Sequence, residues 1–230
     1  MTRESPQFFY ERIADRFEGL DHPDDVRRRL QLVFEDCLTS NNLRGRLTLD
    51  AGCGYGVFSE AATGRGAAVI SVDIGERLVA RATRRAGSRG VVADACRLAF
   101  RDDSFEVIIS SEMIEHTTEP ERAIHELARV LRAGGLLVLT TPNRVWQWPV
   151  RTVSRLGLRP FRGFENFVTW DRLERSCAAA GLDVVVHRGF HPWPFQVGLL
   201  CAARRAERRF GDGWAAKWMV NQAVVARKRP

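Results

Sequence analysis

The feature that most constrains this chain is a short apolar segment that runs directly into a glycine-rich turn. Residues 47–56 read LTLDAGCGYG, so Gly52, Gly54 and Gly56 follow an aspartate at Asp50. Closely spaced glycines permit positive φ angles and let a ligand approach the backbone. A dinucleotide-binding fingerprint needs a further glycine where this chain has Val57. The segment therefore predicts a strand, a ligand-binding turn and a helix, without the complete dinucleotide fingerprint.

Apolar segments alternate with helical patterns along most of the chain. In the pattern for residues 119–133, Thr118 and Glu121 predict a capping box, and Gly134 and Gly135 predict the helix end. Apolar strands separated by helices indicate a parallel sheet covered on both faces. Strands are expected at 46–51, 67–73, 91–94, 105–110, 136–141, 182–187 and 219–227, and helices at 57–65, 76–86, 119–133, 169–181 and 195–210.

The length of 230 residues suits one sheet-containing domain at 45–230, preceded by a helical lid or appendage at 1–44. Hydrophobic residues make up 45% and charged residues 27%, which excludes a fully disordered or fibrous chain. We find no apolar run of membrane-spanning length and no signal-peptide pattern, and the five cysteines form no C-x-x-C pair. The chain is expected to be cytoplasmic, with reduced thiols.

The formal net charge of +7 raises the possibility of a nucleic-acid or anionic-membrane partner. Arginine accounts for this surplus, and the arginines are spread over most of the chain. A spread of this kind indicates a compositional preference more than a binding face, so a nucleic-acid partner is not expected.

Three aspartates stand where successive predicted strands end. Asp50 precedes the glycine turn, Asp73 ends the next strand, and Asp94 ends the third. A carboxylate at the second strand end can accept hydrogen bonds from ribose hydroxyls, and one at the third can face an adenine amino group. Three acids would repel a pyrophosphate, so the pattern favours a neutral or cationic nucleoside.

With these motifs, the chain resembles class I S-adenosylmethionine (SAM)-dependent methyltransferases from about Leu43 to the C-terminus. The resemblance implies an α/β fold: a Rossmann-like, seven-stranded, mostly parallel sheet with an antiparallel last strand and helices on both faces. It implies SAM as cofactor, with S-adenosylhomocysteine (SAH) as product. The residues that it assigns to the cofactor are Asp50, Gly52 and Gly54 near the methionine moiety, Asp73 and Ile74 near the ribose, Asp94 and Ala95 near the adenine, and Ser111 lining the site.

Within this superfamily the chain is most similar to ubiquinone-pathway O-methyltransferases, through SEMIEH at 111–116 and TPNR at 141–144. The segment GFHP at 189–192 matches a late loop of those enzymes loosely, and Glu165-Asn166 replaces their His-Asp. The resemblance implies methyl transfer to a hydroxyl of a small molecule, either a phenolic or other secondary metabolite or a quinone precursor. An RNA 2′-O-methyltransferase, a small-molecule N- or C-methyltransferase and a catalytically silent SAM-binding partner are the alternatives.

A hydroxyl acceptor must lose its proton, which requires a general base or a metal ion that acidifies the hydroxyl. His116 and His191 both follow predicted strands, and both are candidate bases. The spacing of Glu112, Glu115 and His116 would place them on one face of a helical turn, where they could bind Mg²⁺ or Mn²⁺. Glu165 could supply a further metal ligand.

Aromatic and arginine side chains are interspersed between Val145 and Arg162. Tryptophan and arginine suit the interface between lipid headgroups and acyl chains, so peripheral contact with a membrane is one interpretation of this segment. An active-site lid that packs its tryptophans on the acceptor is the alternative. The chain is expected to be a monomer or a homodimer.

Overall fold

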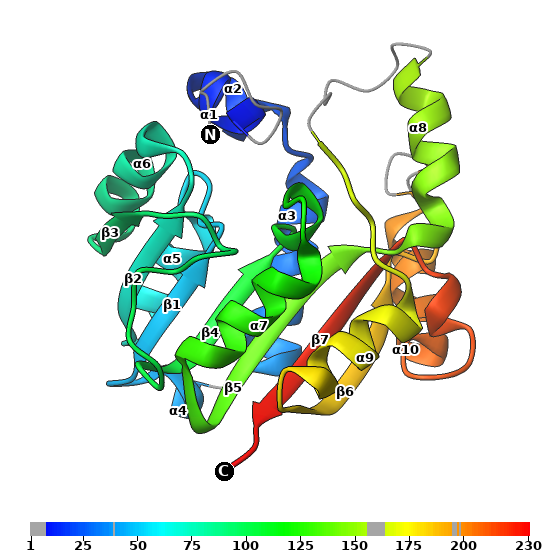
Figure 1. Ribbon diagram of the computed structural model, residues 1–230. Helices are drawn as coiled ribbons and strands as arrows, with labels where there is room; N and C mark the ends of the chain where they lie inside the picture. The colour runs from blue at the N-terminus through cyan, green and yellow to red at the C-terminus, as the bar shows by residue number, and fades with distance from the viewer. Residues whose placement is uncertain (1–7, 39, 156–163, 195–196, 198) are drawn as a thin grey trace.

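The computed structural model describes residues 8–38, 40–155, 164–194, 197 and 199–230. Seven strands form one sheet, with β1 to β5 parallel and β7 antiparallel to both of its neighbours, β5 and β6. This arrangement confirms the expected Rossmann-like fold (Figure 1). Across the sheet the strands are β3 (Arg89–Val92), β2 (Ala68–Asp73), β1 (Leu47–Ala51), β4 (Phe105–Ser111), β5 (Leu131–Pro142), β7 (Asn221–Lys228) and β6 (Leu182–Phe190).

Helices cover both faces of the sheet, with α7 and α9 in front of it and α5 behind it in Figure 1. The helices that follow β1 are α5 (Val57–Thr63), α6 (Glu76–Ala86), α7 (Pro120–Val130), α8 (Gln147–Arg155), α9 (Trp170–Ala179) and α10 (Leu200–Phe210). Before β1 the chain forms α1 (Phe9–Arg12), α2 (Ala14–Leu20), α3 (Pro23–Gln31), a π-helix at Leu32–Cys37 and α4 (Ser40–Leu43). None of the helices among the described residues has the length and apolar character needed to cross a membrane.

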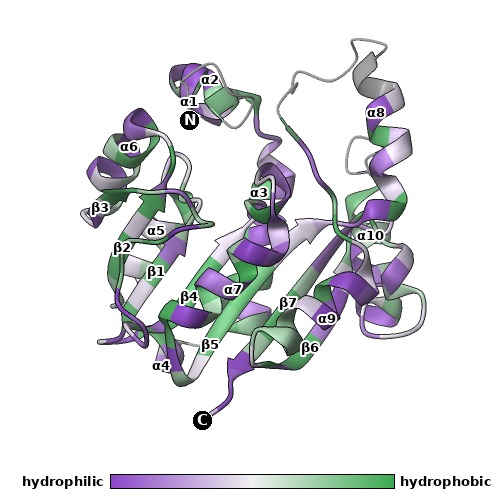
Figure 2. Cartoon of the chain, viewed as in Figure 1, coloured by the Kyte–Doolittle hydropathy of each residue, from purple (hydrophilic) through white to green (hydrophobic). Residues whose placement is uncertain are grey.

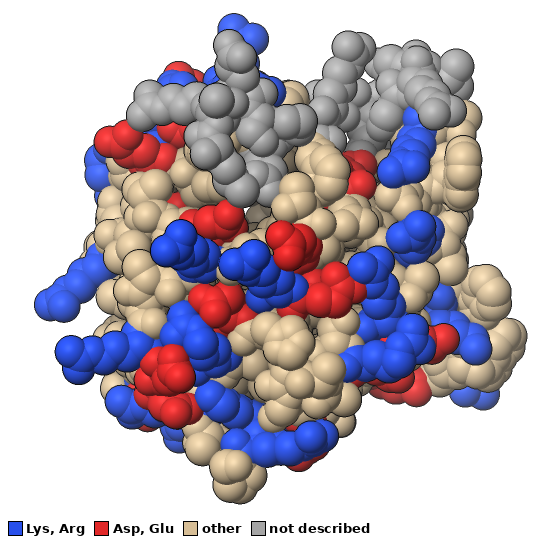
Figure 3. All heavy atoms as spheres, in the orientation of Figure 1, with Lys and Arg blue, Asp and Glu red and all other residues tan. Residues whose placement is uncertain are grey.

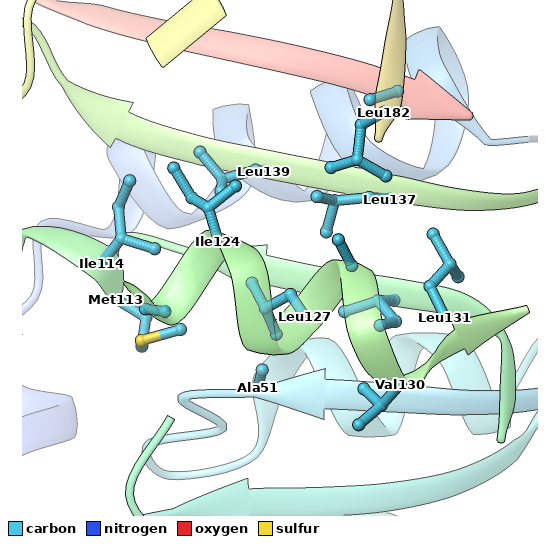
Figure 4. Packing of buried hydrophobic residues seen from close by; sticks show 14 of the residues in the cluster. Ala51, Met113, Ile114, Ile124, Leu127, Val130, Leu131, Leu137, Leu139 and Leu182 are labelled. Carbon is cyan, nitrogen blue, oxygen red and sulfur yellow. The ribbon is translucent and has the colours of Figure 1, made fainter. Parts of the chain in front are cut away.

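The central strands are apolar on both faces, which is why helices must cover each side. On β5, Leu137 and Leu139 pack in the cluster formed with α7, whose Ile124 and Leu127 point toward the sheet (Figure 4). Val138, between the two leucines, belongs to the cluster on the opposite face. Figure 2 shows the result as green strands between helices with purple outer surfaces.

The predicted boundaries of the helix at 119–133 are wrong at both ends. Helix α7 begins at Pro120 after Glu119, whose side chain makes no capping hydrogen bond, and it ends at Val130. The chain then continues as a strand, because Leu131 is fully buried opposite Phe105 of β4. The glycines at 134 and 135 therefore lie within β5 and do not end the helix.

Residues 142–166, where the sequence predicts neither a strand nor a helix, contain helical structure. A 3-10 helix spans Arg144–Trp146 and leads directly into α8, while residues 156–163 of the connection lie outside the described part of the chain. Further on, Thr169 caps α9, since its side chain accepts a hydrogen bond from the backbone N–H of Arg172.

Helix α3 is attached to the C-terminal part of the chain by a buried ion pair. Arg28 Nε donates to Glu207 Oε2 of α10 at 2.7 Å, and the exposed fractions of these side chains are 7% and 4%. The other oxygen of Glu207 accepts the backbone N–H of His191 at 2.9 Å. One carboxylate thus joins α3, α10 and the end of β6, which are far apart in the sequence.

We expect Glu207→Ala to lower the free energy of unfolding by about 3 kcal/mol, because it removes the buried partner of Arg28 Nε, leaves this guanidinium with only the partly exposed Asp36, and takes away the acceptor of the His191 N–H. The control is Asp183→Ala, which removes an exposed ion pair with Arg229 and should cost at most about 1 kcal/mol. Urea denaturation measures both changes. Equal losses in the two variants would show that the buried pair does not hold α3 in place.

Candidate active site

A cavity of about 860 Å³ opens at the carboxyl ends of β1, β2 and β4, beneath the N-terminal helices. Parallel sheets of this kind bind ligands at this edge. The cavity is continuous from the glycine turn to the segment after β4 and to the start of α8. Of the residues assigned to the cofactor in the sequence, those that line it are Gly52, Gly54, Asp73, Ile74, Asp94, Ala95 and Ser111.

The glycine turn is held close to two neighbouring segments. Gly52 has a φ of +77°, and a Cβ there would lie 2.2 Å from Cγ of Met113. Gly56 has a φ of +91°, and its Cβ would lie 2.5 Å from Cα of Ala82 on α6. Only glycine permits this backbone conformation at this separation.

Asp73 and Asp94 reach the cavity from neighbouring strand ends. The Asp73 carboxylate accepts the backbone N–H groups of Gly54 and Gly75, each at 3.0 Å. Burial raises the pKa of Asp73 to about 6. Asp94 accepts the backbone N–H of Cys96 at 2.8 Å. Both carboxylates are therefore oriented by the backbone, as a preformed binding site requires.

Asp50 does not line the cavity among the described residues. Its side chain is 1% exposed and accepts a hydrogen bond from the Ser59 hydroxyl at 2.5 Å. Burial raises the pKa of Asp50 to about 7. The structure thus places this carboxyl beneath the glycine turn, where it links β1 to α5.

Glu112 and Glu115 follow β4 on the other side of the cavity. Glu112 has a φ of +53°, and its Oε2 accepts a hydrogen bond from Asn221 Nδ2 at 2.8 Å. Glu115 is 1% exposed and accepts the Thr141 hydroxyl at 3.0 Å. Burial raises the pKa of Glu112 to about 7 and that of Glu115 well above its ordinary value.

The prediction that one helical turn carries Glu112, Glu115 and His116 is wrong. The 3-10 helix begins only at Ile114, because the left-handed conformation of Glu112 separates it from that turn. Within the described residues, no three His, Cys, Asp or Glu side chains are grouped so that they could hold a metal ion. The assignment of these residues and of Glu165, which lines the cavity, as metal ligands stays a prediction.

His116 lines the cavity next to Tyr10, with 4.7 Å between the ring centroids. Its Nδ1 lies 2.8 Å from the Phe164 carbonyl oxygen, an atom that only accepts hydrogen bonds. Nδ1 therefore carries a proton, and in the neutral ring the lone pair is on Nε2, 3.9 Å from Oε1 of Glu115.

His191 is 5% exposed and is not among the residues that line the cavity. Its Nε2 lies 2.9 Å from Oδ1 of Asp25, which does line it. The structure thus brings His116 to the cavity and places His191 behind Asp25.

Arg29 of α3 is a site residue that the sequence reasoning missed. It is the only described arginine or lysine that lines the cavity, and it is 8% exposed. Its Nε and Nη2 atoms lie 3.0 and 2.9 Å from Oδ2 of Asp25. The run of three arginines at 27–29 resembles a solvated helix face, and only the packing of α3 shows which members are buried.

The tryptophans of the predicted membrane segment face different surroundings. Trp146 lines the cavity and donates its indole N–H to the Trp218 carbonyl, whereas Trp148 is 70% exposed. Trp146 agrees with the lid alternative. Membrane contact through the remaining residues stays a prediction.

Comparisons with known proteins agree with this geometry. Residues 49–139 match a family described as a methyltransferase domain. A ubiquinone biosynthesis O-methyltransferase of Rhizobium rhizogenes is 29% identical over 172 residues, which cover 70% of this chain and 69% of that protein. One of Azoarcus sp. is 31% identical over 156 residues, covering 62% and 66%.

The fold is shared with solved structures. A SAM-dependent methyltransferase of Thermotoga maritima, described as a possible histamine N-methyltransferase, superposes with a TM-score of 0.72 at 18% identity, covering 98% of this chain and 100% of that one. The sheet, the glycine turn and the strand-end aspartates define a Rossmann-like domain that binds a nucleoside cofactor. The matching methyltransferase family and the curated relatives support a class I SAM-dependent methyltransferase with SAM as its cofactor.

The raised pKa of Asp50 predicts how stability depends on pH. The folded state binds this proton more tightly than the unfolded state, so the free energy of unfolding should fall as pH rises from about 4 to about 7. A pKa that differs by one between the folded and unfolded states corresponds to about 1.4 kcal/mol. Urea denaturation measures the free energy of unfolding at pH 5 and at pH 8. The fall between these two values should be smaller in Asp50→Asn than in the wild type. The exposed Asp183→Asn should lose as much as the wild type, and equal losses in all three proteins would contradict the prediction.

Proposed function

We propose that this protein transfers the methyl group of SAM to a hydroxyl of a small molecule. The observation that carries the proposal is that one cavity contains both the strand-end carboxylates Asp73 and Asp94 and the imidazole of His116. The similarity to ubiquinone biosynthesis O-methyltransferases supports a hydroxyl as the acceptor group.

The residues present suit the cofactor. Asp73 would accept hydrogen bonds from the ribose hydroxyls, and Asp94 would face the adenine amino group. Arg29, the only arginine or lysine that the described lining offers, would donate a further hydrogen bond to the α-carboxylate of the cofactor while keeping its pair with Asp25. The glycine turn leaves room for the methionine chain beside the backbone.

The chemistry that the bound cofactor supplies is a methyl group on a sulfonium, already activated for displacement. The protein must align the acceptor oxygen with it and exclude water, which provides much of the rate. The bound cofactor would supply the methyl group to the acceptor oxygen and leave as SAH, and Nε2 of His116 would take up the hydroxyl proton. The hydrogen bond from Nδ1 to the Phe164 carbonyl holds the ring in the tautomer that can accept it.

A screen with methyl-tritiated SAM against pools of phenols and against total RNA tests the acceptor class. We expect label in the phenol pool and none in RNA. Label in RNA alone would replace the proposed function with RNA methylation.

Asp73→Ala should weaken SAH binding by about 2–3 kcal/mol, because it removes a charged acceptor from the two ribose hydroxyls. Calorimetry measures the affinity, and circular dichroism checks that the variant is folded. Asp183→Ala, far from the cavity, is the control and should bind as the wild type does. Unchanged affinity in a folded Asp73→Ala protein would remove Asp73 from the cofactor site.

His116→Ala should lower turnover of a hydroxylated acceptor by about 100-fold or more, because the hydroxyl proton loses its acceptor. Its SAH affinity should stay near that of the wild type. The matched control is His125→Ala, which changes an exposed histidine of α7 and should keep full turnover. Full activity of His116→Ala would contradict the assignment.

The same assay tests the metal prediction. Enzyme treated with EDTA and then supplied with Mg²⁺ or Mn²⁺ should regain lost activity if Glu112, Glu115 and His116 bind a metal. Activity that neither step changes would show that the metal site is wrong.

A further inference from the structure

The cavity is strongly acidic, although the protein as a whole is basic. The chain carries a formal net charge of +7, and Figure 3 shows basic and acidic side chains intermixed on one face. Arg29 is the only described arginine or lysine that lines the cavity. The acids that line it are Glu11, Asp21, Asp25, Asp73, Asp94, Glu112, Glu115 and Glu165.

The single cation is already engaged by two of these acids. Nη2 of Arg29 lies 2.9 Å from Asp25 and 3.9 Å from Asp21. The cofactor adds a sulfonium and an ammonium against one carboxylate, a net single positive charge. Carboxyl groups therefore remain in excess in the occupied site.

Glu112 and Glu115 form the centre of this excess. Within the described part of the chain, neither makes an ion pair with an arginine or lysine. Oε1 of Glu112 is buried and has no hydrogen-bond partner there, while its Oε2 is held by Asn221. A buried carboxyl oxygen without a donor costs free energy unless a ligand supplies one. A hydrogen-bond donor on the molecule to be methylated would satisfy this oxygen.

Aromatic rings stand on the same side of the cavity. Tyr10, Trp146 and Phe167 all line it. The indole N–H of Trp146 is used by the Trp218 carbonyl, so its ring is what it can offer to a ligand. Carboxylates together with aromatic rings form the environment in which organic ammonium groups bind, by charge-assisted hydrogen bonds and cation–π contacts.

We propose that the acceptor is a small molecule that carries a protonated amine in addition to the group that is methylated, and that Glu112 and Glu115 bind this amine. The inference rests on the proposed function and deepens it by naming the chemical class of the acceptor. An anionic acceptor would be repelled by the same carboxylates, and a neutral one would leave Oε1 of Glu112 without a charged donor.

Three phenols that share one ring test the proposal: tyramine, p-cresol and 4-hydroxyphenylacetate, which are cationic, neutral and anionic at pH 8. Each is titrated by calorimetry into the full chain saturated with SAH in the presence of EDTA. We expect tyramine to bind at least about tenfold more tightly than p-cresol, the effect of one charge-assisted hydrogen bond, and 4-hydroxyphenylacetate to bind most weakly.

Glu112→Gln keeps the shape of the side chain and the oxygen that accepts from Asn221, but it removes the charge. The affinity of this variant for tyramine should therefore lie within about threefold of its affinity for p-cresol. Glu119→Gln removes the same charge from an exposed side chain and should keep the wild-type preference. If Glu112→Gln fails to fold, Glu165→Gln, in the same lining, takes its place and should also reduce the preference.

Equal affinity for the three phenols, tighter binding of the anion, or no binding of any of them overturns the proposal. A preference that appears only when a divalent metal is added overturns it as well, because the carboxyl groups would then serve the metal. Failure of SAH binding would instead count against the proposed function. Methyl transfer to the tyramine nitrogen, when SAM replaces SAH, would overturn the proposal too, because the amine would then be the methylated group and not a second, bound group.

Discussion

The close approach of the glycine turn to its two neighbours is the constraint on which the rest of the site depends. At Gly56 the backbone of the turn meets the backbone of Ala82, and at Gly52 it meets Met113 of the segment after β4. These contacts fix α6 on one side of the cavity and the 111–116 segment on the other. The part of the cavity that carries the strand-end aspartates and the part next to Glu112 and Glu115 therefore share one wall, and a side chain at either glycine would push them apart.

The fold buries carboxyl groups around this turn at a cost in stability. Asp50, Asp73 and Glu112 all have pKa values raised by burial, so their ionised forms are disfavoured when the cavity holds only solvent. Hydrogen bonds from Ser59, from the backbone of Gly54 and from Asn221 offset part of this cost. Such a site is stabilised further by ligands that donate hydrogen bonds or carry positive charge, as SAM does.

The part of the cavity that carries the strand-end aspartates could be predicted from the sequence because its signals are local. A strand, a glycine turn and an aspartate at the next strand end depend on short spacings, and the structure places Gly52, Asp73 and Asp94 on one cavity as expected. The parallel sheet followed from apolar segments alternating with helices. The end of α7 was missed because pairing of Leu131 with β4, a tertiary contact, overrides the local glycine signal.

The other half of the cavity could not be predicted, because its wall combines segments that are distant in the chain. Arg29 and Asp25 come from α3, Glu112 and Glu115 from the segment after β4, and Asn221 from β7. What brings them together is buried polar pairing, such as that of Arg28 with Glu207 and of Asp25 with His191, which leaves no periodic pattern in the sequence. Asp25 both lines the cavity and pairs with His191. A substitution that removes the charge of Asp25 would therefore also disturb the attachment of α3. The cavity lining and stability are thus coupled on the α3 side, whereas the backbone N–H of Glu112 bonds the Thr140 carbonyl and stays when the Glu112 side chain is altered, so a change there should affect the fold less.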